Sequence, residues 1–193
     1  MKKYIPILTA AFLTALAPMQ ARADDVSDQI KEALKAYEKH DLSLTAAALD
    51  AASSLLRQQK GENLKGMLPE PMPGWTATDA ESATVANAML GGGTNVSRTY
   101  KKDNKSLEIS FIADSPMMQG LGSLITSGLM TGGDSKLVVI DGRKVTFDKN
   151  ENSYTTMVGK VLVSVKGRGL DDASLRAYLK AIKFSDIEKA SAG

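Results

Sequence analysis

The feature that most constrains this chain of 193 residues is a single change in the spacing of its apolar side chains, at about Asn95. Before this residue, apolar side chains recur at intervals of three and four, which is the period of an amphipathic α-helix. After it they alternate with polar ones, which is the period of a half-buried β-strand. This order predicts an α+β fold, in which a helical hairpin precedes a mostly antiparallel sheet of five or six strands covered by helices.

Residues 24–67 are predicted to form the helical hairpin. One apolar face of the first helix is made by Val26, Ile30, Ala33, Leu34 and Tyr37. A second apolar stripe, rich in alanine, runs from Leu44 to about Lys65, and the polar link at His40-Asp41 predicts an antiparallel pair. The pair resembles a single tetratricopeptide-type repeat. Because such repeats need about three copies to bury their faces, the alternative is an ordinary hairpin docked on its own domain.

Residues 68–75, Leu-Pro-Glu-Pro-Met-Pro-Gly-Trp, predict a semi-rigid strap. Prolines at alternate positions cannot continue a helix and favour an extended backbone. We interpret Trp75, the only tryptophan, as an anchor of the strap in preference to a ligand platform. Residues 80–90 predict a short helix or strand that ends at a run of three glycines.

The domain predicted over residues 76–187 carries the sheet. Turn residues such as Asp141-Gly142 separate short segments rich in β-branched residues. The predicted strands are 96–101, 106–113, 136–141, 143–148, 153–158 and 160–166. A closing helix starts at the acidic pair Asp171-Asp172 and ends near Phe184, which leaves residues 188–193 as a flexible tail.

One segment of this domain, residues 115–133, contains 19 residues without a charge. It is interpreted either as a buried helix across one sheet face or as an apolar flap that meets a lipid, a peptide or a protein, because methionine adapts to irregular surfaces. The predicted binding surface consists of Trp75, Met117, Met118, Leu121, Leu124 and Ile125.

The N-terminus predicts a Sec-type signal peptide over residues 1–23. Two lysines precede an uncharged apolar stretch, and Ala21-Arg22-Ala23 supplies the small-x-small pattern for cleavage between Ala23 and Asp24. The stretch is too short to span a membrane, and without cysteine it cannot carry a lipoprotein anchor. We therefore expect a secreted, cysteine-free periplasmic protein without a transmembrane span.

Cleavage would change the charge of the protein. The loss of Lys2, Lys3 and Arg22 takes the basic residues from 24 to 21 against 22 acidic ones, so the formal net charge falls from +2 to −1. A net positive charge is what favours nucleic acid as a partner. We therefore predict no nucleic-acid partner, and the sequence leaves the oligomeric state open.

The sequence predicts no catalytic, cofactor-binding or metal-binding residue. Zinc and other transition metals need several cysteine or histidine ligands, and His40 is the only histidine. There is no nucleophile elbow, P-loop or dinucleotide fingerprint. The expected function is a non-enzymatic binding or accessory domain that engages an envelope protein or lipid. The alternative is a small carboxylate-dependent hydrolase, since convergent acidic residues leave no sequence motif.

Three motifs carry a resemblance to a family of uncharacterised periplasmic proteins of Gram-negative bacteria. They are the strap Leu68–Trp75, the stretch from Met89-Leu-Gly-Gly-Gly93 to Ser97-Arg-Thr-Tyr100, and Asp114-Ser-Pro116. The resemblance implies no activity. More loosely, the strand order and final helix are similar to α/β/α domains of the PsbP and Mog1 type, which implies a binding or scaffolding role.

Overall fold

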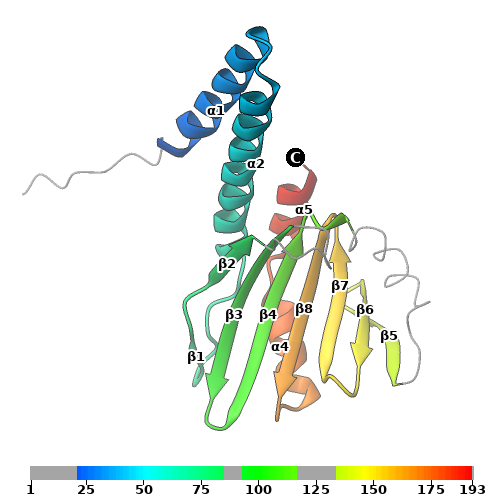
Figure 1. The fold of residues 1–193 in the computed structure, drawn as a ribbon. Helices are drawn as coiled ribbons and strands as arrows, with labels where there is room; N and C mark the ends of the chain where they lie inside the picture. The colour runs from blue at the N-terminus through cyan, green and yellow to red at the C-terminus, as the bar shows by residue number, and fades with distance from the viewer. Residues whose placement is uncertain (1–20, 85–92, 117–133, 193) are drawn as a thin grey trace, which may run out of the picture. The chain divides into compact units, whose positions relative to one another are not determined.

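The structure is a computed structural model, and it describes residues 21–84, 93–116 and 134–192 (Figure 1). The chain divides into two compact units, of which the first ends at Ala52 and the second begins at Ser53. The sequence placed the boundary at the proline strap instead. The division lies within a continuous helix, α2 (Leu42–Lys65), because the last turns of this helix belong to the core of the second unit, where Leu64 is fully buried.

The first unit is the predicted helical hairpin. Helix α1 (Ala21–Glu38) is followed by a tight turn in which His40 has a φ of 60°, and α2 starts at Leu42. The carboxylate of Asp41 accepts a hydrogen bond of 3.0 Å from the backbone N–H of Leu44, so Asp41 caps the new helix. Among the described residues, no helix combines the length and apolar character needed to cross a membrane.

The second unit contains an antiparallel sheet, which has eight strands in the described residues. Seven of them follow one another in the order β1-β3-β4-β8-β7-β6-β5, and β2 pairs with the same edge of β3 as β1 does. The strands are β1 (Thr76–Ala77), β2 (Glu81–Thr84), β3 (Thr94–Lys102), β4 (Lys105–Ala113), β5 (Ser135–Ile140), β6 (Arg143–Asp148), β7 (Ser153–Val158) and β8 (Val161–Arg168).

Helices α4 (Asp172–Ala181) and α5 (Phe184–Ala192) cover one face of this sheet (Figure 1). Alternate residues of the central strands point to these helices, as the period of two requires. The largest fully buried side chains in this layer are Tyr100, Leu107, Ile109, Phe111, Tyr154, Leu175, Tyr178, Leu179 and Ile187. Aliphatic and tyrosine side chains therefore hold this unit together without any cysteine.

The structure confirms the α+β class and corrects two details. The sheet has more strands than the five or six predicted, because residues 76–84 form a broken edge strand of two short pieces, β1 and β2. Residues 188–192, predicted to be a flexible tail, belong to α5, in which Ile187 is buried and Ser191 is 7 % exposed. Strands 143–148 and 153–158 have the predicted bounds.

The N-terminal prediction lies mostly outside the described residues. Helix α1 begins at Ala21, so the expected cleavage point between Ala23 and Asp24 is in its first turn. Of the segment predicted as a short helix or strand, 81–84 is a strand and 85–90 lies outside the described residues.

Candidate functional site

The structure describes one of the six residues of the predicted binding surface. Met117, Met118, Leu121, Leu124 and Ile125 lie outside the described residues. Trp75 is partly buried and meets the ring of Tyr178 edge to face, with the ring centres 5.1 Å apart. This contact fixes the end of the strap to α4, which is the role of an anchor.

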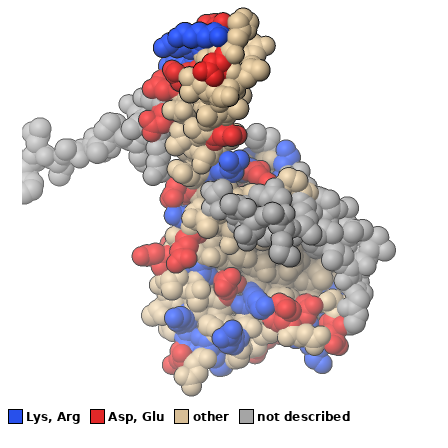
Figure 2. Space-filling view, in the orientation of Figure 1, with Lys and Arg blue, Asp and Glu red and all other residues tan. Residues whose placement is uncertain are grey.

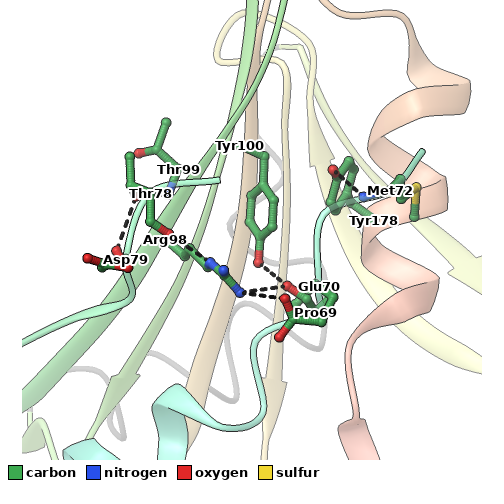
Figure 3. A network of polar contacts seen from close by, with 9 residues as sticks. All are labelled: Pro69, Glu70, Met72, Thr78, Asp79, Arg98, Thr99, Tyr100 and Tyr178. Atoms are coloured by element: carbon green, nitrogen blue, oxygen red, sulfur yellow. Dashed lines mark hydrogen bonds and ion pairs between the residues drawn. The ribbon is translucent and has the colours of Figure 1, made fainter. Parts of the chain in front are cut away.

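The strap is held to the sheet by two side chains of β3 (Figure 3). The buried hydroxyl of Tyr100 donates to the carbonyl oxygen of Pro69 at 2.7 Å, and Arg98 Nη1 donates to the same oxygen at 3.3 Å. Arg98 Nε also donates to the carbonyl of Thr78 at 2.9 Å, and its guanidinium lies 3.5 Å from the carboxylate of Glu70. Two of the sequence motifs, the strap and Ser97-Arg-Thr-Tyr100, therefore bind each other.

The tyrosines of this network are structural. Burial raises the pKa of Tyr100 to about 12, and it also raises the pKa of Tyr178, whose hydroxyl accepts a hydrogen bond from the backbone N–H of Met72. Both phenols therefore stay protonated at any physiological pH. The rings of Tyr100 and Tyr178 are 4.7 Å apart, so the motif residues build a joint between strap, sheet and α4.

Three acids in the described part of the chain, Asp148, Asp171 and Asp172, have a shifted pKa, and in each the pKa is lowered. Partial burial acts to raise the pKa of Asp172, but hydrogen bonds from Tyr154 and Arg176 lower it overall. Backbone N–H groups at turns and helix starts likewise lower the pKa of Asp148 and of Asp171. A general acid needs a pKa raised toward neutrality, so these residues give no support to the hydrolase alternative. No group of three or more potential metal-ligating side chains occurs in the described ranges.

The second unit also has a polar cleft of about 540 Å³ on its sheet, lined by residues of β3, β4 and β8 and by the turn before β7. Glu108 and Arg168 line it, and Lys166 forms an ion pair with Glu151 there. Charged side chains of both signs are interspersed over the visible face of this unit (Figure 2). The cleft therefore has no single-sign field that would select a charged ligand.

The most unusual feature of the described surface is on the first unit, where large apolar side chains are exposed. In α1, Ile30, Leu34 and Tyr37 are 50, 60 and 60 % exposed, and in α2, Leu42 and Leu49 are 67 and 50 % exposed, while Leu44, 44 % exposed, lies on the other side of α2. Isolated apolar side chains are common on protein surfaces, whereas contiguous ones mark interaction sites. Figure 2 shows uncharged surface on the visible side of this hairpin, bordered by acidic and basic side chains.

These five side chains lie on one side of the hairpin, which we call the apolar face. With 3.6 residues per turn, the α1 stripe (Ile30, Leu34 and Tyr37) lies about a quarter turn around the helix from the buried Ala33 and Ala36. The α2 stripe (Leu42 and Leu49) lies about a quarter turn from the buried Ala48 and Ala52. Both rotations run in the same direction when each helix is viewed from its own N-terminus. Because the two helices are antiparallel, equal rotations turn both stripes to the same side of the pair.

The sequence did not separate this face from the buried side of α1. It placed Ile30, Leu34 and Tyr37 together with Val26 and Ala33 on one apolar helix face, and of these the structure buries only Val26 and Ala33. Apart from Val26, the buried side chains in the described part of this unit are alanines, namely Ala33 and Ala36 on α1 and Ala48 and Ala52 on α2. The alanine at every third or fourth position was the signal that could have identified the apolar face.

The hairpin is also acidic. From Ala21 to Ala52, the described part of this unit, the chain has seven acidic residues, three lysines and Arg22, which gives an excess of three negative charges. The acids are Asp24, Asp25, Asp28, Glu32, Glu38, Asp41 and Asp50, and the lysines are Lys31, Lys35 and Lys39. Helices that lie on anionic membranes carry lysine and arginine on their polar face. The charge of the hairpin is therefore opposite to that of a helix that lies on an anionic lipid surface.

Comparison of the chain with protein-family models, with curated proteins and with solved structures gives no match.

Proposed function

We propose that this chain is a non-enzymatic binding or accessory protein of the periplasm, and that it docks on a protein through the apolar face of its hairpin. The observation that carries the proposal is the exposure of Ile30, Leu34, Tyr37, Leu42 and Leu49 on one side of two packed helices. An amphipathic helix surface of this kind is a common mode of protein recognition.

The energy of covering the face sets a condition on the partner. Complete burial of one leucine or isoleucine side chain contributes about 1.5–3 kcal/mol. The exposed fractions of the five side chains amount to just under three whole residues, so covering them contributes roughly 4–9 kcal/mol. Association itself costs about 4–15 kcal/mol. Stable docking therefore requires a partner that buries apolar surface of its own in the same contact.

The experiment is site-specific photo-crosslinking in cells that export the protein. A photoreactive amino acid replaces Leu34 on the apolar face, and the matched control replaces Ser43, which is exposed on α2 outside this face. We expect a discrete protein adduct from position 34 and none from position 43. Equal labelling at both positions, or only a link within the chain itself, would contradict the proposal.

Lipid binding is a separate outcome of the same design. Vesicles of zwitterionic lipid and vesicles of anionic lipid are each mixed with the chain from Asp24 onward and floated on a density gradient. Each mixture is prepared once with the wild type and once with Leu34→Asp. We expect the anionic vesicles not to carry the protein, because the hairpin is acidic. Flotation that depends on Leu34 would replace the protein partner with a membrane surface.

A further inference from the structure

We propose that the occupant of the apolar face is a second copy of this chain, so that two hairpins pair as an antiparallel four-helix bundle. The inference rests on the proposed function, because it names the partner of the same surface.

A second copy satisfies the condition that the burial energy sets. When the apolar face meets itself, Ile30, Leu34, Tyr37, Leu42 and Leu49 of both copies leave water in one contact. The apolar area removed from water is then twice that of one face, while the translational and rotational cost of association is incurred once. An interface between identical surfaces of this kind is the usual arrangement of a symmetric dimer.

The spacing of the side chains fits helix-to-helix packing. On α1 the exposed residues follow at intervals of four and three, and on α2 Leu42 and Leu49 are seven apart. This is the spacing of the apolar positions in four-helix bundles with short loops, whose helices pack knobs into holes. A face two helices wide with this period matches a second helical pair.

The charges beside the α1 stripe specify the direction of pairing. Lys31 lies three residues before Leu34 and Glu38 four residues after it, so both border the stripe on the same edge. If α1 of one copy crosses α1 of the other antiparallel near Leu34, Lys31 of each copy comes beside Glu38 of the other. Parallel pairing would instead bring lysine beside lysine and glutamate beside glutamate.

The present partner of Lys31 does not prevent this exchange. Its ammonium lies 3.1 Å from Asp28 on the same helix, and the two side chains are 72 and 67 % exposed. Exposed pairs of this kind contribute little to stability because water screens them. Lys31 can therefore turn to Glu38 of a second copy without a large loss.

The test is sedimentation equilibrium of the chain from Asp24 onward over a range of micromolar concentrations. We expect the wild type to approach twice the monomer mass with rising concentration. Leu34→Asp should weaken the dimer by about 100-fold or more, because it buries a carboxylate in an apolar contact. Ser43→Asp, which adds the same charge outside the face, should leave the dissociation constant within about threefold.

A charge exchange tests the register. Lys31→Glu and Glu38→Lys should each weaken the dimer by about tenfold, and the double variant should restore wild-type affinity. A mixture of the two single variants should form a heterodimer tighter than either homodimer. Circular dichroism of every variant checks that the hairpin stays helical, which we expect because all substituted side chains are exposed.

The outcomes separate this inference from the function on which it rests. A wild type that stays monomeric at every concentration overturns the dimer, and so does a double charge variant no tighter than the single ones. If that monomer still gives an adduct with another protein from position 34 in cells, the docking function stands with a different partner. If position 34 gives no adduct with any protein, both proposals are overturned.

Discussion

The joint between strap and sheet allows a quantitative test, since two donors serve one acceptor. The carbonyl oxygen of Pro69 accepts from the hydroxyl of Tyr100 at 2.7 Å and from Arg98 at 3.3 Å. The perturbations are Tyr100→Phe, Arg98→Met and the double variant. Phenylalanine keeps the ring against Tyr178, and methionine keeps an apolar stem on β3, so both substitutions remove mainly hydrogen bonds.

The expected loss in the free energy of unfolding depends on how many donors each variant leaves to the carbonyl oxygen of Pro69. Tyr100→Phe leaves Arg98 as its donor, so the free energy of unfolding should fall by about 1 kcal/mol, the usual net value of one hydrogen bond. Arg98→Met also removes the bond to Thr78 and the contact with Glu70, and should cost about 2 kcal/mol. In the double variant the carbonyl loses both donors. An unsatisfied buried acceptor costs about 1–3 kcal/mol, so the double variant should exceed the sum of the single ones by about 1 kcal/mol.

The assay is urea unfolding of the chain from Asp24 onward, followed by the fluorescence of Trp75. This residue is the only tryptophan and lies at the end of the strap, so its signal reports the joint directly. Tyr37→Phe is the matched control, because Tyr37 is 60 % exposed in the hairpin. Loss of its hydroxyl should change the free energy of unfolding by less than about 0.5 kcal/mol. Additive losses in the double variant, or a loss from Tyr100→Phe no larger than the control, would refute the shared-acceptor reasoning.

Three further predictions concern the second unit. Gly93→Ala should lower the free energy of unfolding by about 3 kcal/mol or more in chemical denaturation, because Gly93 has a φ of 126° and an added Cβ would lie 2.7 Å from the carbonyl oxygen of Ala113. Gly142→Ala, where φ is 77° and no atom lies within 4 Å of the added Cβ, should lower it by only about 1 kcal/mol, and equal losses would show that the close contact is unimportant. Burial raises the pKa of Tyr154 to about 12 from an ordinary value of about 10, so the contribution of this phenol to stability is complete below pH 10 and is lost as the pH rises to 12. Titration followed by absorbance should show that Tyr154 ionises well above pH 10 in the folded protein, and ionisation near pH 10 would contradict the burial. Asp171→Ala should lower the melting temperature at pH 7, because it removes the cap of α4. Hydrogen bonding holds the pKa of Asp171 below its usual range, so the difference in melting temperature between variant and wild type should shrink as the pH falls through that pKa. A difference in melting temperature that does not depend on pH would contradict the capping role.

The elements of the sheet were largely predictable because their signals are local. Strand β6 and strand β7 have their predicted bounds, and Asp141-Gly142 forms the turn before β6 with φ values of 49° and 77°. Turn chemistry and alternation need only neighbouring residues. The broken edge strand was not predictable in this way, since β1 and β2 are too short to show a period and depend on pairing with β3.

The predicted binding surface and the apolar face proposed above involve different residues. The sequence assigned an apolar binding surface to Trp75 and to residues in 115–133, and of these the structure describes only Trp75, which packs against Tyr178. The sequence grouped the exposed Ile30, Leu34 and Tyr37 with the buried Val26 and Ala33 on one apolar face of the first helix. Periodicity locates an apolar stripe on a helix, but it does not say which of two adjacent stripes a neighbour will cover.

The sequence alone determined the compositional limits of this protein: a fold without cysteine, a helical hairpin before an antiparallel sheet, and a proline strap between them. Each of these depends on residue type or on short-range spacing. Only the tertiary structure decided that β4 lies beside β8, that Arg98 and Tyr100 bind the strap, and that alanines of α1 and α2 are buried while neighbouring leucines stay exposed. These outcomes are decided by which distant surfaces pack most closely, and close packing is a property of three-dimensional shape that no local pattern contains.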